Sequence, residues 1–384
     1  MQLNYEAAVV GGGVVGTTIA AALVEAGLRT ILIDAGCCGG QGASRYSEGI
    51  VRLYDPDAEI MRLAAFSQEC LQTTGFGRIF GPSINRTGVV YMAAPDEEEA
   101  IREAARRLSS PAYPLRLLSG GEVRDISRFV DHRPDRVTLY EAGGGPSDVR
   151  GAVRSMARLV RCGGAVLENA KVRRVVPEGE GVRLTLDQEA GAVHARAAVI
   201  AGGAWTAALL PQLGLFARTI PLVRLFASEP LIMPVIDTTA ATFAVPLSGN
   251  LVHVGSQIRH AAPTPDDLGP PPGDERADAL RRLASMTGRR EDGPTFDVLP
   301  GLDSYAPDGR PVIGFLDDGP CYVAAGLAGI GYKLAPGIAF HAARQIARRL
   351  GRRVPSADDA LAAFTPARLP RLAAPVPTGA GHDQ

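Results

Sequence analysis

Lysine is nearly absent from the sequence, since only Lys171 and Lys333 of its 40 basic residues are lysines. We interpret this bias as the codon usage of a GC-rich genome, but it draws attention to each lysine. An excess of either charge is also missing, because 40 basic and 41 acidic residues leave a formal charge of -1. A chain this balanced has no overall attraction to nucleic acid or to an anionic membrane. We therefore predict neither as a partner.

Three further absences narrow the class of protein. No apolar run approaches the roughly 18 residues of a membrane span, and no basic and apolar leader precedes the first predicted strand. The 5 cysteines have no regular spacing, which argues against a disulfide framework or a zinc site. The sequence therefore predicts a cytoplasmic protein without a metal. We interpret the neighbouring Cys37 and Cys38 as small loop residues, with a redox switch as the alternative.

The length of 384 residues is too great for one ordinary core and predicts two domains. Hydrophobic periodicity and glycine or proline punctuation predict the elements. The expected strands cover residues 6–10, 30–33, 88–93, 172–176, 182–186, 197–201, 312–313 and 322–325. The expected helices cover residues 14–26, 58–73, 97–108, 147–161, 277–287 and 335–350. We expect loops over 39–49 and over the proline-rich 263–274, and a frayed tail over 366–384.

The stretch AAVVGGGVVGTTIAAALVEAGLRTILIDAG, residues 7–36, holds Gly11-x-Gly13-x-x-Gly16 between a predicted strand and a predicted helix. The first glycine allows a tight turn, the second lets the backbone approach a pyrophosphate, and the third lets the helix pack on the strand. The N–H groups and positive dipole of the helix start then face the phosphates. Asp34 ends the next strand, where a carboxylate suits ribose hydroxyls. The pattern predicts a nucleotide-binding βαβ unit.

The motif alone does not separate FAD from NAD. An NAD domain usually continues with several more βα units, whereas here the second strand leads to a small-residue loop, GGQGASRYSEGIVRLYD. Two more glycine-rich turns follow much later, in VIAGGAWT and GLAGIGYKLAPG. Several distant segments of this kind suit the length of FAD. We predict FAD, with an NAD-only dehydrogenase as the alternative.

At this point the chain resembles the FAD-dependent amine and amino acid oxidoreductases related to D-amino acid oxidase, and is most similar to their sarcosine oxidase-like branch. The resemblance covers roughly residues 5 to 350 and rests on residues 9–36, on GASRYSEGIVRLYD, on VIAGGAWT, and on APDGRPVIG followed by AAGLAGIGYKLAPG. It implies an α/β fold with a Rossmann-type FAD-binding domain and a second α+β substrate domain on a mixed or antiparallel sheet. The implied FAD-binding domain covers 1–80, 146–215 and 300–365, and the substrate domain covers 81–145 and 216–299.

The resemblance also implies which residues lie along the cofactor. These are Gly11, Gly13, Val14, Val15 and Gly16 at the pyrophosphate, Asp34 and Ala35 at the adenosine ribose, Ser44, Arg45 and Ser47 on the flavin side, Val172 at the adenine, Ala201, Gly202 and Trp205 in the second turn, and Gly329, Ile330, Gly331, Tyr332 and Lys333 along the isoalloxazine ring.

The same branch binds its substrate carboxylate with an arginine matching Arg52 and a lysine matching Lys333. The residues themselves suit that role. A lysine in a glycine-rich turn holds a carboxylate as a point charge, and an arginine offers a fork for bidentate contact. A surface salt bridge is the alternative for each of them.

This sequence departs from the branch at three positions. The branch often tethers its flavin through a cysteine just before the APDG block, but GLDSYAPDG has Gly301 there, so we expect non-covalent FAD. His253 matches a lysine that promotes reaction with O₂. His253 is therefore a candidate active-site residue, and the choice between oxidase and dehydrogenase stays open. Gly49 replaces a basic arginine near the flavin.

The resemblance implies an enzyme that oxidises the C–N bond of an amino acid or of a secondary amine carrying a carboxylate. Arg52 and Lys333 would anchor the carboxylate, hydride would pass from the neutral amine to flavin N5, and the imine would hydrolyse in water. O₂ or another acceptor would then take the electrons. One alternative is a biosynthetic enzyme acting on a cyclic imine, a carrier-bound substrate or a peptide. Another is a non-catalytic FAD-binding subunit of a larger complex, and homo- or hetero-oligomers both remain open.

Overall fold

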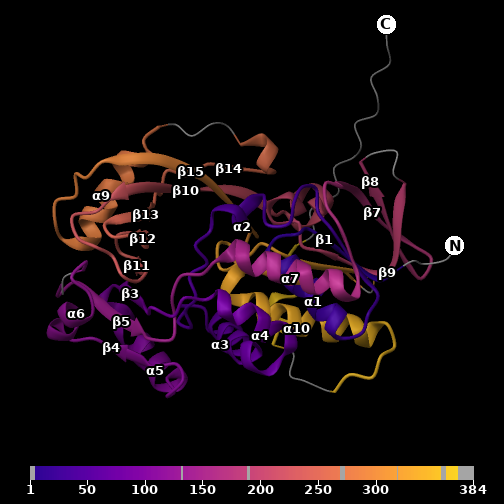
Figure 1. Ribbon diagram of the computed structural model, residues 1–384, viewed down its shortest axis with the longest axis horizontal. Helices are drawn as coiled ribbons and strands as arrows, with labels where there is room; N and C mark the ends of the chain where they lie inside the picture. The colour runs from indigo at the N-terminus through magenta and orange to yellow at the C-terminus, as the bar shows by residue number, and fades with distance from the viewer. Residues whose placement is uncertain are drawn as a thin grey trace, which may run out of the picture.

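The computed structural model describes residues 5–130, 133–187, 191–268, 273–317, 319–355 and 360–370. Its described part contains two large β-sheets (Figure 1). Helices α1, α7 and α10 lie together beside the first sheet, and the second sheet occupies the other end of the molecule with α5, α6 and α9 around it. The predicted α/β fold with a second sheet-based unit is confirmed.

The first sheet forms around the predicted βαβ unit. Its strand order is β16–β17–β9–β1–β2–β6, and the hairpin of β7 and β8 joins it through β9. The strands β17, β9, β1, β2 and β6 run parallel to one another, and near-continuous apolar runs are typical of such doubly covered strands. The bounds are β1 (Tyr5–Val10), β2 (Thr30–Ile33), β6 (Ala165–Leu167), β7 (Val172–Glu178), β8 (Gly181–Leu186), β9 (Ala192–Ile200), β16 (Val312–Phe315) and β17 (Cys321–Ala325).

Helix α1 is the central helix of this half. It packs against α7 and α10, and α10 in turn packs against α3. Every residue of α1 from Val14 to Leu23 is buried, as expected for a helix that is apolar all round. The helices of this half are α1 (Val14–Glu25), α2 (Gly42–Tyr46), α3 (Ala58–Thr73), α4 (Gly75–Phe80), α7 (Val149–Gly163), α8 (Thr206–Leu209) and α10 (Gly331–Arg349).

The second sheet has the order β14–β10–β13–β12–β11–β3–β5–β4, with β15 paired along the length of β10. Its strands are β3 (Val89–Ala93), β4 (Leu115–Leu117), β5 (Val137–Glu141), β10 (Phe216–Phe226), β11 (Val235–Asp237), β12 (Thr242–Ser248), β13 (Leu251–Gly255), β14 (Ala261–Ala262) and β15 (Thr295–Tyr305). Its helices are α5 (Glu98–Leu108), α6 (Gly120–Ile126) and α9 (Glu275–Thr287). Because β15 continues past residue 299, the sheet extends beyond the expected substrate segment, and the domain boundaries stay a prediction.

Some elements differ from the sequence prediction. The expected loop over 39–49 contains α2, and β9 begins at Ala192 rather than at residue 197. Helix α10 begins at Gly331, four residues before the predicted start, although it contains Pro336. The glycine-rich turn and this proline conceal the helix start, because both residue types normally mark a helix boundary.

The chain also packs further toward its C-terminus than expected. Leu369 is buried, and the Arg368 Nε donates to Asp308 Oδ2 at 2.7 Å. Residues 371–384 of the expected tail lie outside the described residues.

The carboxyl ends of four parallel strands meet at one edge of the first sheet. After β1 comes Gly11, after β2 comes Asp34, after β9 comes Ala201, and after β17 comes Gly326. Ligands of open α/β sheets bind outside this kind of edge. All four segments belong to stretches that the sequence predicted to hold the cofactor.

Candidate active site

The first turn requires glycine at two positions. Gly11 has a φ of 107°, and a Cβ built on it would lie 2.3 Å from the carbonyl oxygen of Ala201. A Cβ on Gly16 would lie 1.9 Å from the carbonyl oxygen of Gly11. The turn can therefore approach the end of β9, and α1 can approach the turn, only because both side chains are absent.

The start of α1 is open to an anion. Its N-cap residue is Gly13, which has no side chain to cap the first turn, so backbone N–H groups remain for a phosphate. Ser44 of α2 is buried beside them, and its Oγ accepts a hydrogen bond from Val14 N at 3.0 Å. Ser44 thus adds a hydroxyl beside the first turn, whereas the resemblance placed it on the flavin side, and its contact with the cofactor stays a prediction.

Asp34 lies at the end of β2, facing the first turn. Its Oδ2 accepts from Gly12 N at 2.6 Å, and its Oδ1 accepts from Gly36 N at 2.8 Å. A carboxylate has about four lone-pair sites, so these two contacts fix its orientation and leave capacity for two ribose hydroxyls. The residues present therefore fit the pyrophosphate and ribose of FAD.

Two other predicted segments join this edge. The ring of Trp205 lies against Gly42 of α2, where a Cβ would be 3.2 Å away from it. In the turn before α10, Ala328 and Gly329 both have positive φ, 46° and 83°, and a non-glycine residue in this region is strained. The turn is tied to β15, because Ala328 N donates to Ser304 O at 2.9 Å.

The positions of the remaining predicted cofactor residues do not decide whether they contact the cofactor. Val172 begins β7 and is buried. Arg45 and Ser47 are exposed, and Arg45 lies over the ring of Tyr46. Tyr332 is buried against Phe80, its hydroxyl lies 2.6 Å from Ser83 Oγ, and burial raises its pKa to about 12. The contacts of these residues with a cofactor stay predictions.

Arg52 and Lys333 do lie together, but a carboxylate of the chain lies between them. Lys333 Nζ donates to Asp55 Oδ2 at 2.8 Å, and Arg52 Nη2 donates to the same oxygen at 3.4 Å. The side chain of Lys333 is 2% exposed, that of Asp55 10% and that of Arg52 13%. Lys333 therefore forms a salt bridge, but a buried one. Asp55 was not predicted from the sequence, because its contact with Lys333 spans 278 residues.

One guanidinium nitrogen of Arg52 makes no hydrogen bond to the described residues. Its Nη1 is buried and has no hydrogen-bond partner among the described residues, and its guanidinium lies 5.4 Å from the ring centre of Tyr91. A buried donor without a partner costs about 1–3 kcal/mol. The oxygen of a bound ligand would remove that cost.

Burial and neighbouring charges shift the pKa values of Lys333 and Asp55. Burial lowers the pKa of Lys333 to about 8, Arg52 lowers it further, and Asp55 opposes both. Burial tends to raise the pKa of Asp55, but Lys333 and Arg52 outweigh it and hold that pKa below its ordinary value. The ionised pair is therefore kept together by mutual attraction against the cost of burying it.

Glu141 holds the backbone just after Arg52 in place through hydrogen bonds. It is fully buried on β5, and its carboxylate accepts from Leu53 N at 2.6 Å and from Tyr54 N at 3.0 Å. Tyr113 also donates its hydroxyl to Glu141 at 3.0 Å. The sequence did not point to Glu141, since nothing in its local pattern reveals partners more than 80 residues away.

His253 lies on β13 and is held from both sides. Its Nδ1 is 2.7 Å from Glu48 Oε1, and Arg224 Nε donates to its Nε2 at 3.3 Å. These two contacts orient the imidazole ring, with Nδ1 toward Glu48 and Nε2 toward Arg224. Glu48 follows α2, so the contact joins His253 to the loop predicted to line the flavin. The sequence did not point to Glu48.

Asp303 on β15 is a further acidic group at this edge that the sequence did not indicate. Its Oδ2 would lie 3.0 Å from a Cβ built on Gly329, in the turn before α10. Burial raises its pKa to about 6, with Arg259 opposing the shift. It is opposite Arg218 on β10.

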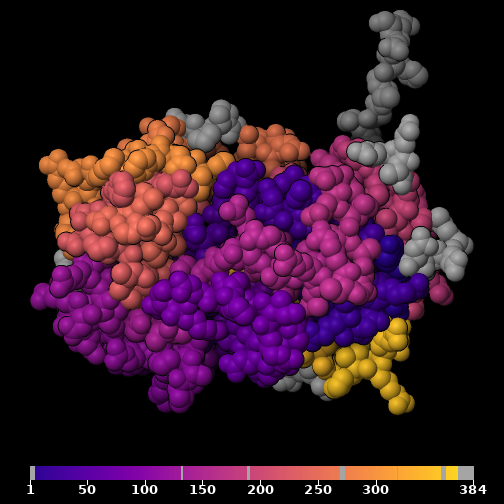
Figure 2. Space-filling view, in the orientation of Figure 1, coloured from indigo at the N-terminus to yellow at the C-terminus, as the bar shows by residue number. Residues whose placement is uncertain are grey.

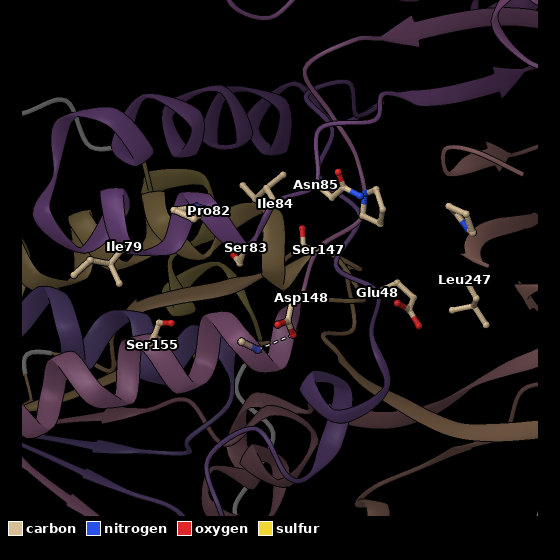
Figure 3. Close-up of a pocket in the computed structure, with 13 residues that line it drawn as sticks. Glu48, Ile79, Pro82, Ser83, Ile84, Asn85, Ser147, Asp148, Ser155 and Leu247 are labelled. Atoms are coloured by element: carbon tan, nitrogen blue, oxygen red, sulfur yellow. Dashed lines mark hydrogen bonds between the residues drawn. The ribbon is translucent and has the colours of Figure 1, made fainter. Parts of the chain in front are cut away.

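A separate cavity of about 780 Å³ opens nearby. Figure 3 shows Glu48 and Leu247 on one side of it and Ile79 and Ser155 on the other. In Figure 2, the magenta α7 lies near the centre of the same face of the molecule, next to the salmon strands of the second sheet. The cavity reaches Glu48 but is not lined by Arg52 or Lys333. It is therefore distinct from the cluster of Arg52, Asp55 and Lys333.

Other predicted features give no sign of chemistry. In the described residues the cysteines are free, and no group of three or more His, Cys, Asp or Glu side chains is placed to hold a metal. Burial raises the pKa of Cys38 to about 12, so that thiol stays protonated. Among the same residues, no helix has the length and apolar character needed to cross a bilayer.

A glycine-rich turn before a helix start, three further turns at the same sheet edge and a second sheet beside them are typical of a dinucleotide-binding α/β protein. The chain belongs to the DAO family of FAD dependent oxidoreductases, whose sequence pattern matches residues 6–345. FAD is therefore its cofactor, and the predicted family and cofactor are confirmed.

Several relatives and solved structures are similar to this chain over most of its length. Glycine oxidase of Geobacillus kaustophilus is 25% identical over 360 residues, which cover 88% of this chain and 91% of the relative. N-methyl-L-tryptophan oxidase of Salmonella newport is 28% identical over 220 residues, which cover 55% and 56%. The structure of L-proline dehydrogenase from P. horikoshii has a TM-score of 0.81 at 20% identity, covering 96% of this chain and 98% of that one. The last similarity supports the fold alone.

Proposed function

We propose that this protein oxidises the C–N bond of an amino acid or N-substituted amino acid whose carboxyl group binds Arg52. When bound, FAD supplies the two-electron acceptor. The names of the relatives, glycine oxidase and N-methyl-L-tryptophan oxidase, support an amino acid substrate and O₂ as the electron acceptor. The observation that carries the proposal is the buried Arg52 Nη1, which has no partner within the described residues.

The charges of the cluster suit one incoming carboxylate. Arg52 and Lys333 contribute two positive charges and Asp55 one negative charge, so the group of three is net positive. Within this group, the buried Nη1 of Arg52 is the donor that has no partner among the described residues, and it would receive the substrate oxygen. The guanidinium also lies over the Tyr91 ring, 5.4 Å from its centre, where a cation–π contact favours this position.

The residues around the site do not need to supply a strong base. His253 is already hydrogen-bonded on both ring nitrogens. A substrate amine that binds in its neutral form requires no proton to be removed before the C–N bond is oxidised. The imine product then hydrolyses in water. We assign His253 to the wall of the site, where its contact with Glu48 fixes the loop beside the cofactor.

We also propose that the FAD is bound non-covalently. The position at which the related branch carries a cysteine is Gly301, in the middle of β15. A Cβ there would lie 2.5 Å from the backbone oxygen of Ile220 on β10. Any side chain at this position would push the two strands apart, which supports a site without a thioether link.

Replacing Arg52 by methionine tests the role of the guanidinium. The loss of a charged hydrogen bond of about 1.5–3 kcal/mol should raise KM for the carboxylated substrate by about 10- to 150-fold, with a smaller change in kcat. Steady-state kinetics on the FAD-loaded variant measure both constants. Arg62→Met is the matched control, because Arg62 makes a surface ion pair with Glu59. An unchanged KM for every carboxylated substrate would remove Arg52 from the site.

A further inference from the structure

We propose that Asp303 is a substrate-binding residue whose carboxylate accepts a hydrogen bond from the amine of the amino acid. The inference rests on the proposed function, because it adds a partner for the substrate nitrogen to the partner already proposed for the carboxyl group. A primary or secondary amine carries the required N–H in both its protonated and its neutral form. The inference therefore names amino acids with a primary or secondary amine as the substrate class.

The carboxylate of Asp303 lies against the turn before α10. Its Oδ2 would be 3.0 Å from a Cβ built on Gly329, and this is the turn that the family resemblance places along the isoalloxazine ring. Strand β15 and the turn are tied together, because Ala328 N donates to Ser304 O at 2.9 Å. Asp303 is therefore held beside the segment where the proposed oxidation takes place.

Asp303 has no partner of its own in the part of the chain that the structure describes, where its carboxylate makes neither a hydrogen bond nor an ion pair. Arg218 is directly opposite on β10, and opposite charges in that arrangement usually pair. The guanidinium of Arg218 lies instead over the Tyr305 ring, 5.7 Å from its centre. The carboxylate thus keeps its acceptor capacity for a ligand.

The surroundings of Asp303 make its negative charge unfavourable until a ligand group arrives. The residue is half-buried, and burial raises its pKa to about 6, with the charge of Arg259 opposing the shift. A raised pKa means that the folded protein disfavours the ionised carboxylate compared with open water. A bound ammonium or amine N–H would offset this cost.

The charges beside the start of α10 match the two polar ends of an amino acid. The negative Asp303 lies at Gly329, and the net positive group of Arg52, Asp55 and Lys333 lies at the first turn of the helix, four residues further along the chain. An α-amino acid carries a negative carboxylate and a positive amine on one carbon atom. The site therefore presents the opposite charges in the same order along one short segment.

Two pairs of small ligands measure recognition of the amine without turnover. Glycine and propionate form one pair, and α-aminoisobutyrate and pivalate form the other, so that an ammonium group replaces a methyl group of similar size. α-Aminoisobutyrate has no α-hydrogen and binds without being oxidised. Binding to the FAD-loaded protein is followed under argon by the change in flavin absorption. We expect the amino compound of at least one pair to bind about tenfold or more tightly than its methyl counterpart.

Asp303→Asn removes the charge and keeps the shape of the side chain. We expect the preference for the amino compound to fall about tenfold and the methyl compound to bind as before. Asp292→Asn is the matched control, because it removes a negative charge from an exposed ion pair with Arg290, and it should leave the preference unchanged. Equal binding within both wild-type pairs, no binding by either amino compound, or a full preference in an Asp303→Asn protein that retains FAD would overturn the proposal.

The pH dependence of the wild-type preference gives a second readout. Lowering the pH from about 7.5 to about 5.5 protonates a carboxyl group whose pKa is about 6, so the preference for the amino compound should fall. The charged and titratable side chains of the elements around Asp303 are Tyr305 on β15, Arg218 on β10, Arg259, and Arg45 and Tyr46 on α2. Tyrosine and arginine do not titrate in this range. The preference of Asp303→Asn should not change over the same range, and an equal fall in that variant would assign the effect to another group.

The outcomes separate this inference from the proposed function. If no amine ever reduces the flavin, the proposed function fails, and the ligand pairs still show whether Asp303 binds an amine. If an amino acid reduces the flavin but Asp303→Asn retains the full preference, only the role of Asp303 fails. If that variant loses FAD, the wild-type pH dependence decides, and a preference that stays constant between about pH 7.5 and about pH 5.5 refutes the role of Asp303.

Discussion

Lys333→Met is expected to lower the free energy of unfolding by at most about 3 kcal/mol at neutral pH, because it removes one partner of a buried ion pair. The cost of burying the Lys333 charge, which lowers its pKa to about 8, disappears with it and offsets part of that loss. Methionine is close to lysine in length and fills the same space. Asp55 would keep only Arg52, whose Nη2 is 3.4 Å away, while remaining 90% enclosed. Lys333→Met should therefore lower the free energy of unfolding more than the removal of a surface lysine would.

The stability lost in Lys333→Met is expected to depend on pH in one direction. Asp55 has a folded-state pKa below its ordinary value, so in the wild-type protein it stabilises the fold above the unfolded pKa and loses that contribution as the pH falls. Without Lys333 the pKa of Asp55 rises. The difference between wild type and variant should therefore narrow as the pH is lowered from 7 toward about 4.

Urea unfolding at several pH values measures this difference. Lys171→Met is the matched control, because Lys171 is the other lysine of the chain and gives only its backbone carbonyl to a hydrogen bond from Asp187. We expect the control to change stability by less than about 0.5 kcal/mol. Equal stability of Lys333→Met and wild type at pH 7 would contradict the buried ion pair.

Gly16→Ala is expected to produce a protein that does not retain FAD. The added Cβ would lie 1.9 Å from the carbonyl oxygen of Gly11, and backbone cannot move aside as a flexible side chain can. Either α1 moves away from the turn or the turn opens, and both changes misplace the N–H groups that face the phosphates. We expect FAD binding to weaken by about 100-fold or more.

Titration of the apoprotein with FAD, followed by fluorescence quenching, measures this loss. Gly121→Ala is the control, because a Cβ on Gly121 at the start of α6 meets nothing within 4 Å. The control should bind FAD as the wild type does. Wild-type FAD affinity in Gly16→Ala would show that the first turn does not hold the pyrophosphate.

The cofactor half of this protein was predictable because its signals are local. The turn at Gly11, the helix after it and Asp34 all lie within one βαβ unit, and their spacing reflects one compact piece of structure. The second sheet was expected only from the family resemblance. Its long pairing of β10 with β15 joins residues 70 to 89 positions apart, which periodicity does not reveal.

The candidate site was predictable only in part for the same reason. Arg52 and Lys333 were identified, but the carboxylate that separates them was not. Asp55 contacts Lys333, which is 278 residues away along the chain, and Glu141 contacts Leu53, which is 88 residues away. In its local sequence, each looks like an ordinary surface acid. Only the fold shows that Lys333 is enclosed beside Asp55.

The central claim is that this FAD-bound chain oxidises an amino acid. The visible spectrum of the purified protein under argon, before and after adding a panel of amino acids, their amides and N-methylated amino acids, tests it most directly. We predict flavin absorption that bleaches with at least one compound, returns when air is admitted if O₂ is the acceptor, and moves entirely into the supernatant on acid precipitation. Flavin bands that no compound bleaches, or no bands even after FAD is added, would contradict the account.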